Sequence, residues 1–247
     1  MSSASGVIRR SGLTTPLADV HAAIVACDRC ERLRSYCQRV AREKKAAHRA
    51  DVYWGKPVPG FGDAQARVLV LGLAPAAHGA NRTGRVFTGD GPGASGDFLM
   101  RAMHAAGFAN ITTSQRTDDG LVLRDAYMTA TVRCAPPDNK PAPGEIAACH
   151  AHLVSEIAAL PRITVIVCLG KIAFDAAWRI LDHKGVVVRP RPDFEHGRVF
   201  RTASGPTIIA SYHPSRQNTN TGRLTPPMLA SVFRTARRLV RASTSSA

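Results

Sequence analysis

A ring and a carboxylate lie close together in a glycine-rich loop that follows a short apolar run. The run spans residues 68–71 (Val-Leu-Val-Leu), and the loop carries Phe87 and Asp90. An apolar run of this length predicts a buried strand, and ligands bind in the loops at the carboxyl ends of strands in open α/β sheets. A ring can stack on a planar ligand, and a carboxylate can stabilise a cation or orient a water molecule. An Asp is also common in turns and a Phe in cores. A purely structural role for either residue therefore stays open.

A histidine follows the last predicted strand, within residues 211–218 (Ser-Tyr-His-Pro-Ser-Arg-Gln-Asn). We expect His213 at the same sheet edge as Phe87 and Asp90. A histidine in this setting is often only structural, but convergence with the first loop favours a chemical role. The polar side chains that follow are suited to phosphate and sugar contacts; they are Ser215, Arg216, Gln217 and Asn218.

Four of the six cysteines have the spacing of a metal site. Cys27 and Cys30 form a C-x-x-C pair, and Cys134 and Cys149 lie far downstream. Such a pair brings two thiolates to one metal centre, and two distant cysteines can complete the shell. A redox pair or a structural zinc site fits the same spacing. Cys37 could replace one ligand, whereas Cys168 lies in an apolar run and is predicted to be a core residue.

Strands and helices alternate along the chain, which predicts a parallel sheet covered on both faces. Predicted strands span residues 67–72, 125–132, 163–169 and 206–212, and predicted helices span 17–48, 95–106, 145–160, 171–181 and 226–242. Residues 185–204 form a hairpin or an excursion. We therefore predict an α/β fold, a three-layer α/β/α sandwich around a four-stranded parallel sheet. A single domain spans 15–242, with flexible ends at 1–14 and 243–247.

The charge of the chain favours a polyanionic partner. Its 247 residues carry a formal net charge of +15, with 27 Arg against 6 Lys. A field of this size attracts nucleic acid, although a GC-rich genome would also enrich arginine. No apolar run reaches the length of a membrane span, and no secretory signal precedes the cysteines. We expect a monomeric cytoplasmic protein that associates with the nucleoid.

Together these segments resemble the uracil-DNA glycosylase superfamily, most closely its family 5, the type b enzymes. The matching pieces are residues 72–79 (Gly-Leu-Ala-Pro-Ala-Ala-His-Gly), 81–85 (Asn-Arg-Thr-Gly-Arg), 87–90 (Phe-Thr-Gly-Asp), 95–99, 119–121, 132–137 and 213–215. The resemblance runs from Cys27 to about Arg238. It implies excision of damaged bases from double-stranded DNA, leaving an abasic site for base excision repair. It also implies a [4Fe–4S] cluster held by Cys27, Cys30, Cys134 and Cys149, with no metal in the bond-breaking step.

The resemblance also suggests roles for individual residues. A base inside a duplex must be flipped into a pocket to be reached. Phe87 would stack on it, Asp90 would stabilise the sugar cation or orient water, and His213 would donate a hydrogen bond to the leaving base. Base-binding positions are Ala74, Phe87 and Ala130, and DNA-binding positions are Asn81, Ser95, Ser215, Arg216, Gln217 and Asn218.

The sequence departs from the uracil-specific branches at two places. Leu73 and Ala74 supply no carboxylate or amide, and Ala130 stands where those branches place an asparagine. The amide that would read the uracil edge is therefore missing, which predicts a less selective pocket that accepts uracil, hypoxanthine and related deaminated bases. Residues 91–94 also lengthen the link after Asp90.

Two other functions compete with this interpretation. The first is a non-catalytic DNA-damage-binding module with a structural metal cluster. The second is a metal-dependent nucleotide hydrolase, which would need clustered carboxylates, whereas the acidic residues here are scattered. No lysine nucleophile for strand cutting is evident, so we expect a monofunctional glycosylase.

Overall fold

A six-stranded sheet divides the molecule into layers, in the order β1-β3-β2-β4-β6-β5. The computed structural model describes residues 16–244, with positions 90 and 92 excepted. Four central strands run parallel, as the sequence predicts; they are β2 (Val68–Gly72), β3 (Ala126–Ala130), β4 (Val165–Leu169) and β6 (Thr207–Ser211). Two short edge strands, β1 (Phe61–Gly62) and β5 (Val199–Phe200), pair antiparallel and were not predicted. Two residues are too few to show a periodicity, so the predicted count of four was incomplete.

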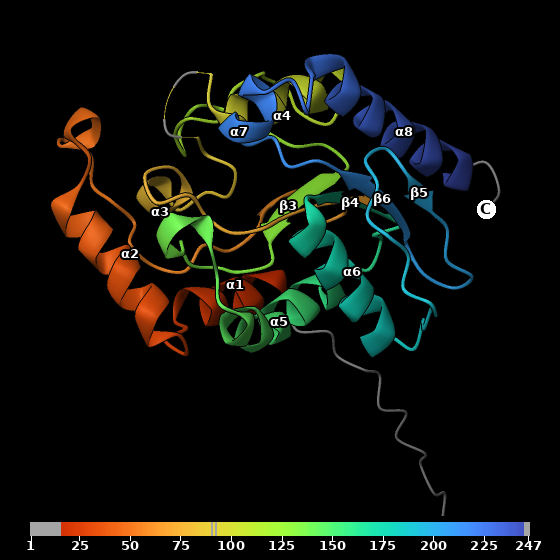
Figure 1. Cartoon of the computed structure of the whole chain (residues 1–247), viewed down its shortest axis with the longest axis horizontal. Helices are drawn as coiled ribbons and strands as arrows, with labels where there is room; N and C mark the ends of the chain where they lie inside the picture. The colour runs from red at the N-terminus through yellow and green to blue at the C-terminus, as the bar shows by residue number, and fades with distance from the viewer. Residues whose placement is uncertain (1–15, 90, 92, 245–247) are drawn as a thin grey trace, which may run out of the picture.

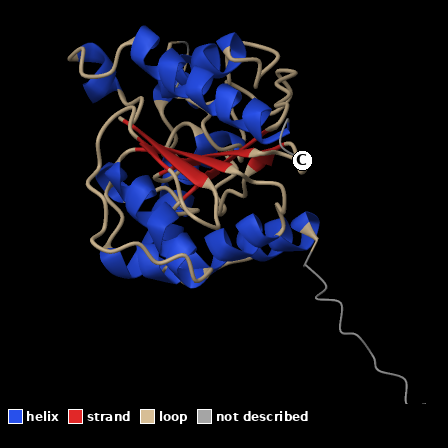
Figure 2. Ribbon diagram, turned by 90° about the vertical axis from the view of Figure 1, so that its right-hand side faces the viewer, coloured by secondary structure: helices blue, strands red, loops and turns tan. Residues whose placement is uncertain are grey.

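Helices cover both faces of this sheet, which confirms the three-layer α/β arrangement (Figure 1; Figure 2). One layer holds α4 (Ser95–Ala105) and α8 (Pro226–Thr244), and the other holds α1 (Leu17–Val25), α5 (Pro143–Ala158) and α6 (Lys171–His183). Successive residues of β2 alternate between the two apolar cores, because neighbouring side chains of a strand point to opposite faces. Both faces are buried, which explains the continuous apolar runs.

The predicted helix over residues 17–48 is wrong, because the chain breaks there into α1 and α2 (Glu31–Glu43). Helix α1 ends before Cys27, and Cys30 is the residue that precedes α2. The C-x-x-C segment therefore lies between the two helices, and α2 then runs along one end of the molecule (Figure 1). The apolar spacing continues across the break, so the spacing alone did not reveal this turn.

Short helices connect these larger elements. They are η1 (Ala46–His48), α3 (Ala80–Thr83), η2 (Pro137–Asn139) and α7 (Arg216–Asn220). None of the helices that the structure describes combines the length and apolarity needed to cross a bilayer. The predicted flexible segment 1–14 lies outside the described residues, as do residues 245–247, while α8 extends to Thr244.

Candidate active site and cysteine pocket

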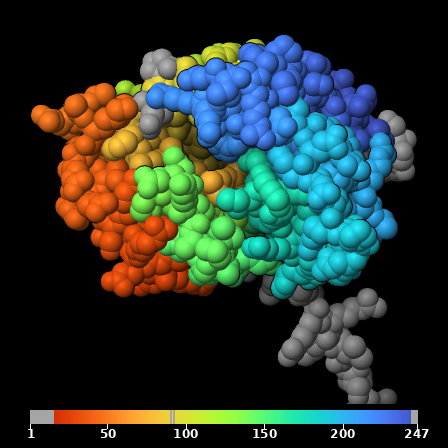
Figure 3. All heavy atoms as spheres, in the orientation of Figure 1, coloured from red at the N-terminus to blue at the C-terminus, as the bar shows by residue number. Residues whose placement is uncertain are grey.

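A cavity of about 590 Å³ opens where β2 and β3 end. Its walls come from the loop after β2, the loop that carries Phe87 and the start of α4. The end of β3, the η2 turn and the loop at residues 212–215, which we call the histidine loop, complete them. Figure 3 shows the hollow between the blue segment that contains α7 and the green segment that contains η2. Parallel strands bring these distant segments together because their carboxyl ends share one sheet edge.

The Phe87 ring lies directly over the last residue of β2. A Cβ atom on Gly72 would come within 2.6 Å of the ring atom Cζ, so only glycine permits this approach. Phe87 has φ of 58°, a left-handed backbone that a residue with a side chain rarely adopts. Such strain persists where the surrounding structure determines it, often at ligand sites. The ring is half-buried and lines the cavity.

An ion pair between the buried Arg85 and the half-buried Asp119 holds the loop that carries Phe87. Arg85 donates two hydrogen bonds to Asp119, at 2.9 and 2.5 Å. Although burial alone would raise the pKa of the Asp119 carboxyl, the Arg85 hydrogen bond and three backbone N–H groups hold it well below its usual range. Asp119 therefore stays ionised and locks Arg85 in place.

The buried carboxylate of Asp97 holds the segment that leads into α4. Asp97 accepts hydrogen bonds from the backbone nitrogens of Gly93 at 2.8 Å and Ser114 at 3.1 Å. Asp90 itself lies outside the described residues, so its predicted catalytic role stays a prediction. Gly89, its neighbour, lines the cavity.

His213 also lines the cavity. Burial lowers its pKa to about 4, because the imidazolium form would lose hydration. The ring is therefore neutral at pH 7 and can donate one N–H hydrogen bond. Asn218, predicted to bind DNA, does not line the cavity; its Nδ2 atom donates to the backbone oxygen of His213 at 2.8 Å.

Most of the predicted site residues gather around this one cavity. Those that line it are Ala74, Phe87, Ser95, Ala130, His213, Ser215, Arg216 and Gln217. Asn81 does not line the cavity, and its role as a DNA contact stays a prediction. Its side chain is fully buried, and its Nδ2 donates to the backbone oxygens of Cys37 at 3.3 Å and Ala77 at 3.4 Å. The amide satisfies buried carbonyl groups, which stabilises the turn into α3.

Sequence reasoning missed the η2 turn, which supplies Asp138, Asn139 and Lys140 to the cavity wall. Asp138 and Asn139 have φ of 53° and 56°, so two consecutive residues adopt left-handed backbone. Asp and Asn tolerate this region better than other side chains. The signal available was the Pro-Pro-Asp-Asn stretch at 136–139, which is typical of a tight turn and overlaps the end of the motif at 132–137.

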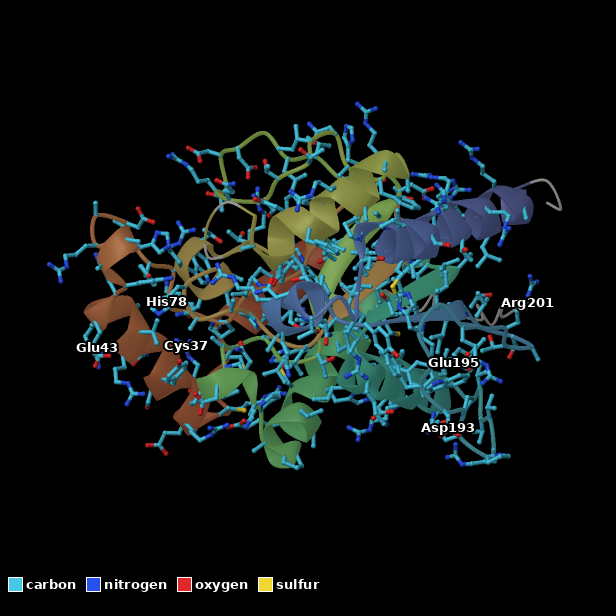
Figure 4. The ribbon with its side chains drawn as sticks, turned by 45° about the horizontal axis from the view of Figure 1, so that its top comes forward. Cys37, Glu43, His78, Asp193, Glu195 and Arg201 are labelled. Atoms are coloured by element: carbon cyan, nitrogen blue, oxygen red, sulfur yellow. The ribbon has the colours of Figure 1, made fainter. Side chains whose placement is uncertain are left out.

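The four predicted metal ligands surround a second, much smaller cavity of about 20 Å³. Cys27, Cys30, Cys134 and Cys149 all line it, whereas Cys37 does not. The Cys37 thiol is fully buried and donates to the backbone oxygen of Ala135 at 3.5 Å. Figure 4 shows Cys37 on α2, at the opposite end of the molecule from Asp193 and Glu195. Cys168 is fully buried in β4, as expected of a core residue.

The environment of these thiols opposes their ionisation when no cation is bound. Burial raises the pKa of Cys149 to about 11, and burial together with the neighbouring Cys134 raises that of Cys30. A metal centre reverses this balance, because a bound cation favours the thiolate. Among the described residues, no three His, Cys, Asp or Glu side chains are placed to hold a single metal ion.

A fully buried ion pair stands behind this cysteine pocket. Arg133 Nη2 lies 2.7 Å from Glu156 Oε2, and both side chains are at most 1% exposed. Glu156 also accepts hydrogen bonds from Thr129, Tyr127 and the backbone nitrogen of Gly60. The Arg133 backbone nitrogen donates to the Cys149 sulfur at 3.3 Å. The segment after β3 thus joins the cysteine pocket to the strand end that carries Ala130.

Comparison with known proteins agrees with this geometry. The family model described as Uracil DNA glycosylase superfamily matches residues 59–237. The chain belongs to the uracil-DNA glycosylase superfamily. Within this superfamily, it is 48% identical over 216 residues to the type-5 uracil-DNA glycosylase of Thermus thermophilus (87% of this chain, 94% of the relative). Identity to that of Mycobacterium tuberculosis is 46% over 224 residues (90% and 81%). The type-4 uracil-DNA glycosylase of Archaeoglobus fulgidus is 29% identical over 179 residues (71% and 80%). The resemblance to family 5 is confirmed.

Proposed function

We propose that this protein is a monofunctional DNA glycosylase that flips and hydrolytically excises uracil and other deaminated bases, such as hypoxanthine, from double-stranded DNA. The observation that carries the proposal is the single cavity shared by Phe87, Ala130 and His213, which come from three distant segments. The type-5 uracil-DNA glycosylases named above support it as relatives of this chain.

The cavity residues have complementary roles in this proposal. The flipped base stacks on the Phe87 ring, beside the small side chains of Ala74 and Ala130. As the glycosidic bond stretches, negative charge grows on the base and positive charge on the sugar. Neutral His213 donates a hydrogen bond to the base, and Asp90 stabilises the sugar cation or orients the attacking water.

The small residues at the cavity wall support a broad base preference. Ala130 ends β3 and pairs in register with Gly72, so this wall offers methyl and backbone groups rather than a side-chain amide. Neither Ala130 nor Gly72 carries a side-chain group that would disfavour binding of a purine ring or of a base with a changed exocyclic group. Asn139 lies across the cavity and can hydrogen-bond a water molecule or a base edge.

Two exposed cations on facing rims suit the DNA backbone. Lys140 follows the η2 turn and Arg216 begins α7, and both line the cavity while remaining exposed. Phosphate contacts of this kind position a duplex without reading its sequence. Because Lys140 lies at the cavity, borohydride trapping is a necessary test: a monofunctional enzyme forms no covalent lysine adduct with the abasic product.

The decisive test of catalysis uses duplexes that carry uracil or hypoxanthine, followed by alkali cleavage of abasic sites. We expect the wild type to release both bases, and Asp90→Asn and His213→Ala to lose most of their excision rate, with a residual single-turnover rate still measurable, while keeping most of their DNA affinity. A His183→Ala variant, at the exposed end of α6, serves as the matched control. Unchanged excision in both variants would instead support a different catalytic centre. Binding without excision by the wild type would support the non-catalytic DNA-damage-binding module.

We also propose that Cys27, Cys30, Cys134 and Cys149 hold a [4Fe–4S] cluster with a structural role. All four cysteines line one pocket, which supports a shared ligand role. A zinc site requires Zn–S bonds of about 2.3 Å, and no described trio of side chains is placed for a single ion. A cluster spaces its thiolates farther apart, because several iron and sulfide ions lie between them.

The cluster proposal is tested by absorbance in the visible iron–sulfur charge-transfer band. We expect Cys149→Ser to remove the band and iron content, and Cys168→Ala, at a fully buried cysteine of β4 outside the pocket, to keep both. Retained excision in EDTA would exclude the metal-dependent hydrolase. Zinc in place of iron in the purified protein would overturn the cluster assignment.

A further inference from the structure

Side chains from two different segments hold the backbone on either side of His213. Residues 212–215 adopt neither helix nor strand. Before His213, the backbone nitrogen of Tyr212 donates to Nδ1 of His196 at 3.1 Å. After it, Asn218 donates to the His213 backbone oxygen at 2.8 Å. The direction in which His213 enters the cavity therefore depends on two side chains outside the loop.

His196 comes from the excursion between α6 and β6, which the catalytic proposal does not use. The turn around it is fixed to β6 by backbone hydrogen bonds from Gly197 to Ala210 at 2.7 Å and from Ala210 to Arg198 at 3.0 Å. Glu195, its neighbour, marks this excursion in Figure 4. A rigid turn thus presents His196 to the start of the histidine loop.

The His196 ring also stacks on Tyr212. The two ring centroids are 4.9 Å apart and the rings are tilted by 15°. The Arg223 guanidinium lies 4.6 Å from the Tyr212 centroid. Because Nδ1 accepts the Tyr212 N–H, the imidazole must be neutral with its proton on Nε2. Burial lowers the pKa of His196, which favours this neutral form.

We propose that His196 is a positioning residue for base excision, which fixes the Tyr212 backbone and thereby directs His213 toward the leaving base. The inference rests on the proposed glycosylase function. It assigns a role to the excursion at residues 184–206, which supplies the acceptor that the loop itself lacks. If the His196 ring served only in packing, it would not need its Nδ1 acceptor to face the Tyr212 backbone nitrogen.

Three substitutions separate the hydrogen bond from the stacking. His196→Phe keeps a flat ring but removes the acceptor, His196→Asn keeps an acceptor oxygen near the Nδ1 position, and His196→Ala removes both. Single-turnover rates at saturating enzyme measure the chemical step, and fluorescence anisotropy measures DNA affinity. We expect His196→Ala and His196→Phe to slow excision about tenfold with affinity within about twofold, and His196→Asn to recover most of the rate. His183→Ala is again the control.

A double-mutant cycle with His213→Ala tests whether His196 acts through its neighbour. If it does, the His196→Ala change costs about tenfold in the wild type and almost nothing when His213 is already alanine. Thermal melting of each variant controls for folding. An equal cost in both backgrounds would overturn the proposal and leave His196 a stabilising residue. So would a His196→Phe variant as fast as the wild type. Absence of excision by the wild type would instead refute the glycosylase function itself.

Discussion

The candidate active-site cavity and the cysteine pocket both border the segment that follows β3, yet they are built differently. Ala130 lines the first, and Arg133 and Cys134 line the second. The cavity of about 590 Å³ is shaped by close backbone approach at small residues, whereas the pocket of about 20 Å³ is lined by two buried and two half-buried cysteines with a buried ion pair behind it. The cavity therefore depends on the close packing of small residues, and the region of the cysteine pocket depends on the pairing of buried charges. Changes to the cavity should alter rate, and changes behind the pocket should alter stability.

Breaking the buried ion pair tests the stability half of this comparison. Arg133→Met leaves the Glu156 carboxylate buried without its cationic partner, so we expect a loss of about 3–5 kcal/mol in the free energy of unfolding. Urea denaturation measures it. The matched control is Arg32→Met, which removes the exposed partner of Glu145 and should cost about 1 kcal/mol or less. Equal losses in the two variants would show that burial of the pair does not matter.

Crowding the cavity wall tests the rate half. Gly72→Ala places a Cβ 2.6 Å from the present position of Phe87 Cζ, so the ring must move. Displacing a stacking surface by a fraction of an ångström or more lowers excision by about a hundredfold, while melting changes little. Gly144→Ala, near the start of α5 with open space around its Cβ, should leave the rate unchanged. A wild-type rate in Gly72→Ala would remove Phe87 from the proposed stacking role.

The pH dependence of stability sharpens the comparison at His213. Its pKa is about 4 in the folded protein and near 6.5 when unfolded, so the unfolded chain binds a proton first as pH falls. Stability is therefore lost between pH 6.5 and 4, by an amount on the order of 2 kcal/mol from this group. The difference between wild type and His213→Gln in denaturation series isolates it. Parallel stability curves for the two proteins would contradict a lowered pKa for His213.

The smallest expected effect concerns the cavity rim. If Lys140 and Arg216 each contact a phosphate, each alanine variant reduces the slope of log affinity against log salt by about 0.9. Binding titrations at several salt concentrations measure the slope. Arg162→Ala, an exposed cation just before β4 at the opposite end of the strands, should leave it unchanged. An equal change in all three variants would indicate a diffuse field rather than rim contacts.

Much of the sheet could be predicted because its signal is local. The four parallel strands are short apolar runs, and the alternation with helices indicates their direction. The break between α1 and α2 and the two-residue edge strands could not be predicted, since neither changes the local apolar spacing. These features depend on what packs against them in the folded chain.

The candidate site divides in the same way. The glycine-rich motif, His213 and the four cysteines stand out in the sequence, and the structure brings their described members to two cavities. Asn81 belongs to the same motif but turns inward, because nearby buried carbonyl groups need its amide. A motif shows which residues recur together, without showing which of them face the ligand.

The sequence by itself determined the chemistry available to this protein. It supplies the Phe87 ring, the His213 imidazole, four cysteines with the spacing of a metal site and a strongly basic chain. It also determined the order of strands and helices, because apolar periodicity and turn residues act over a few positions. Only the tertiary structure decided that η2 joins the cavity, that Glu156 compensates Arg133, and that His196 holds Tyr212. These contacts join separate elements, and packing rather than local propensity selects the side chains that meet.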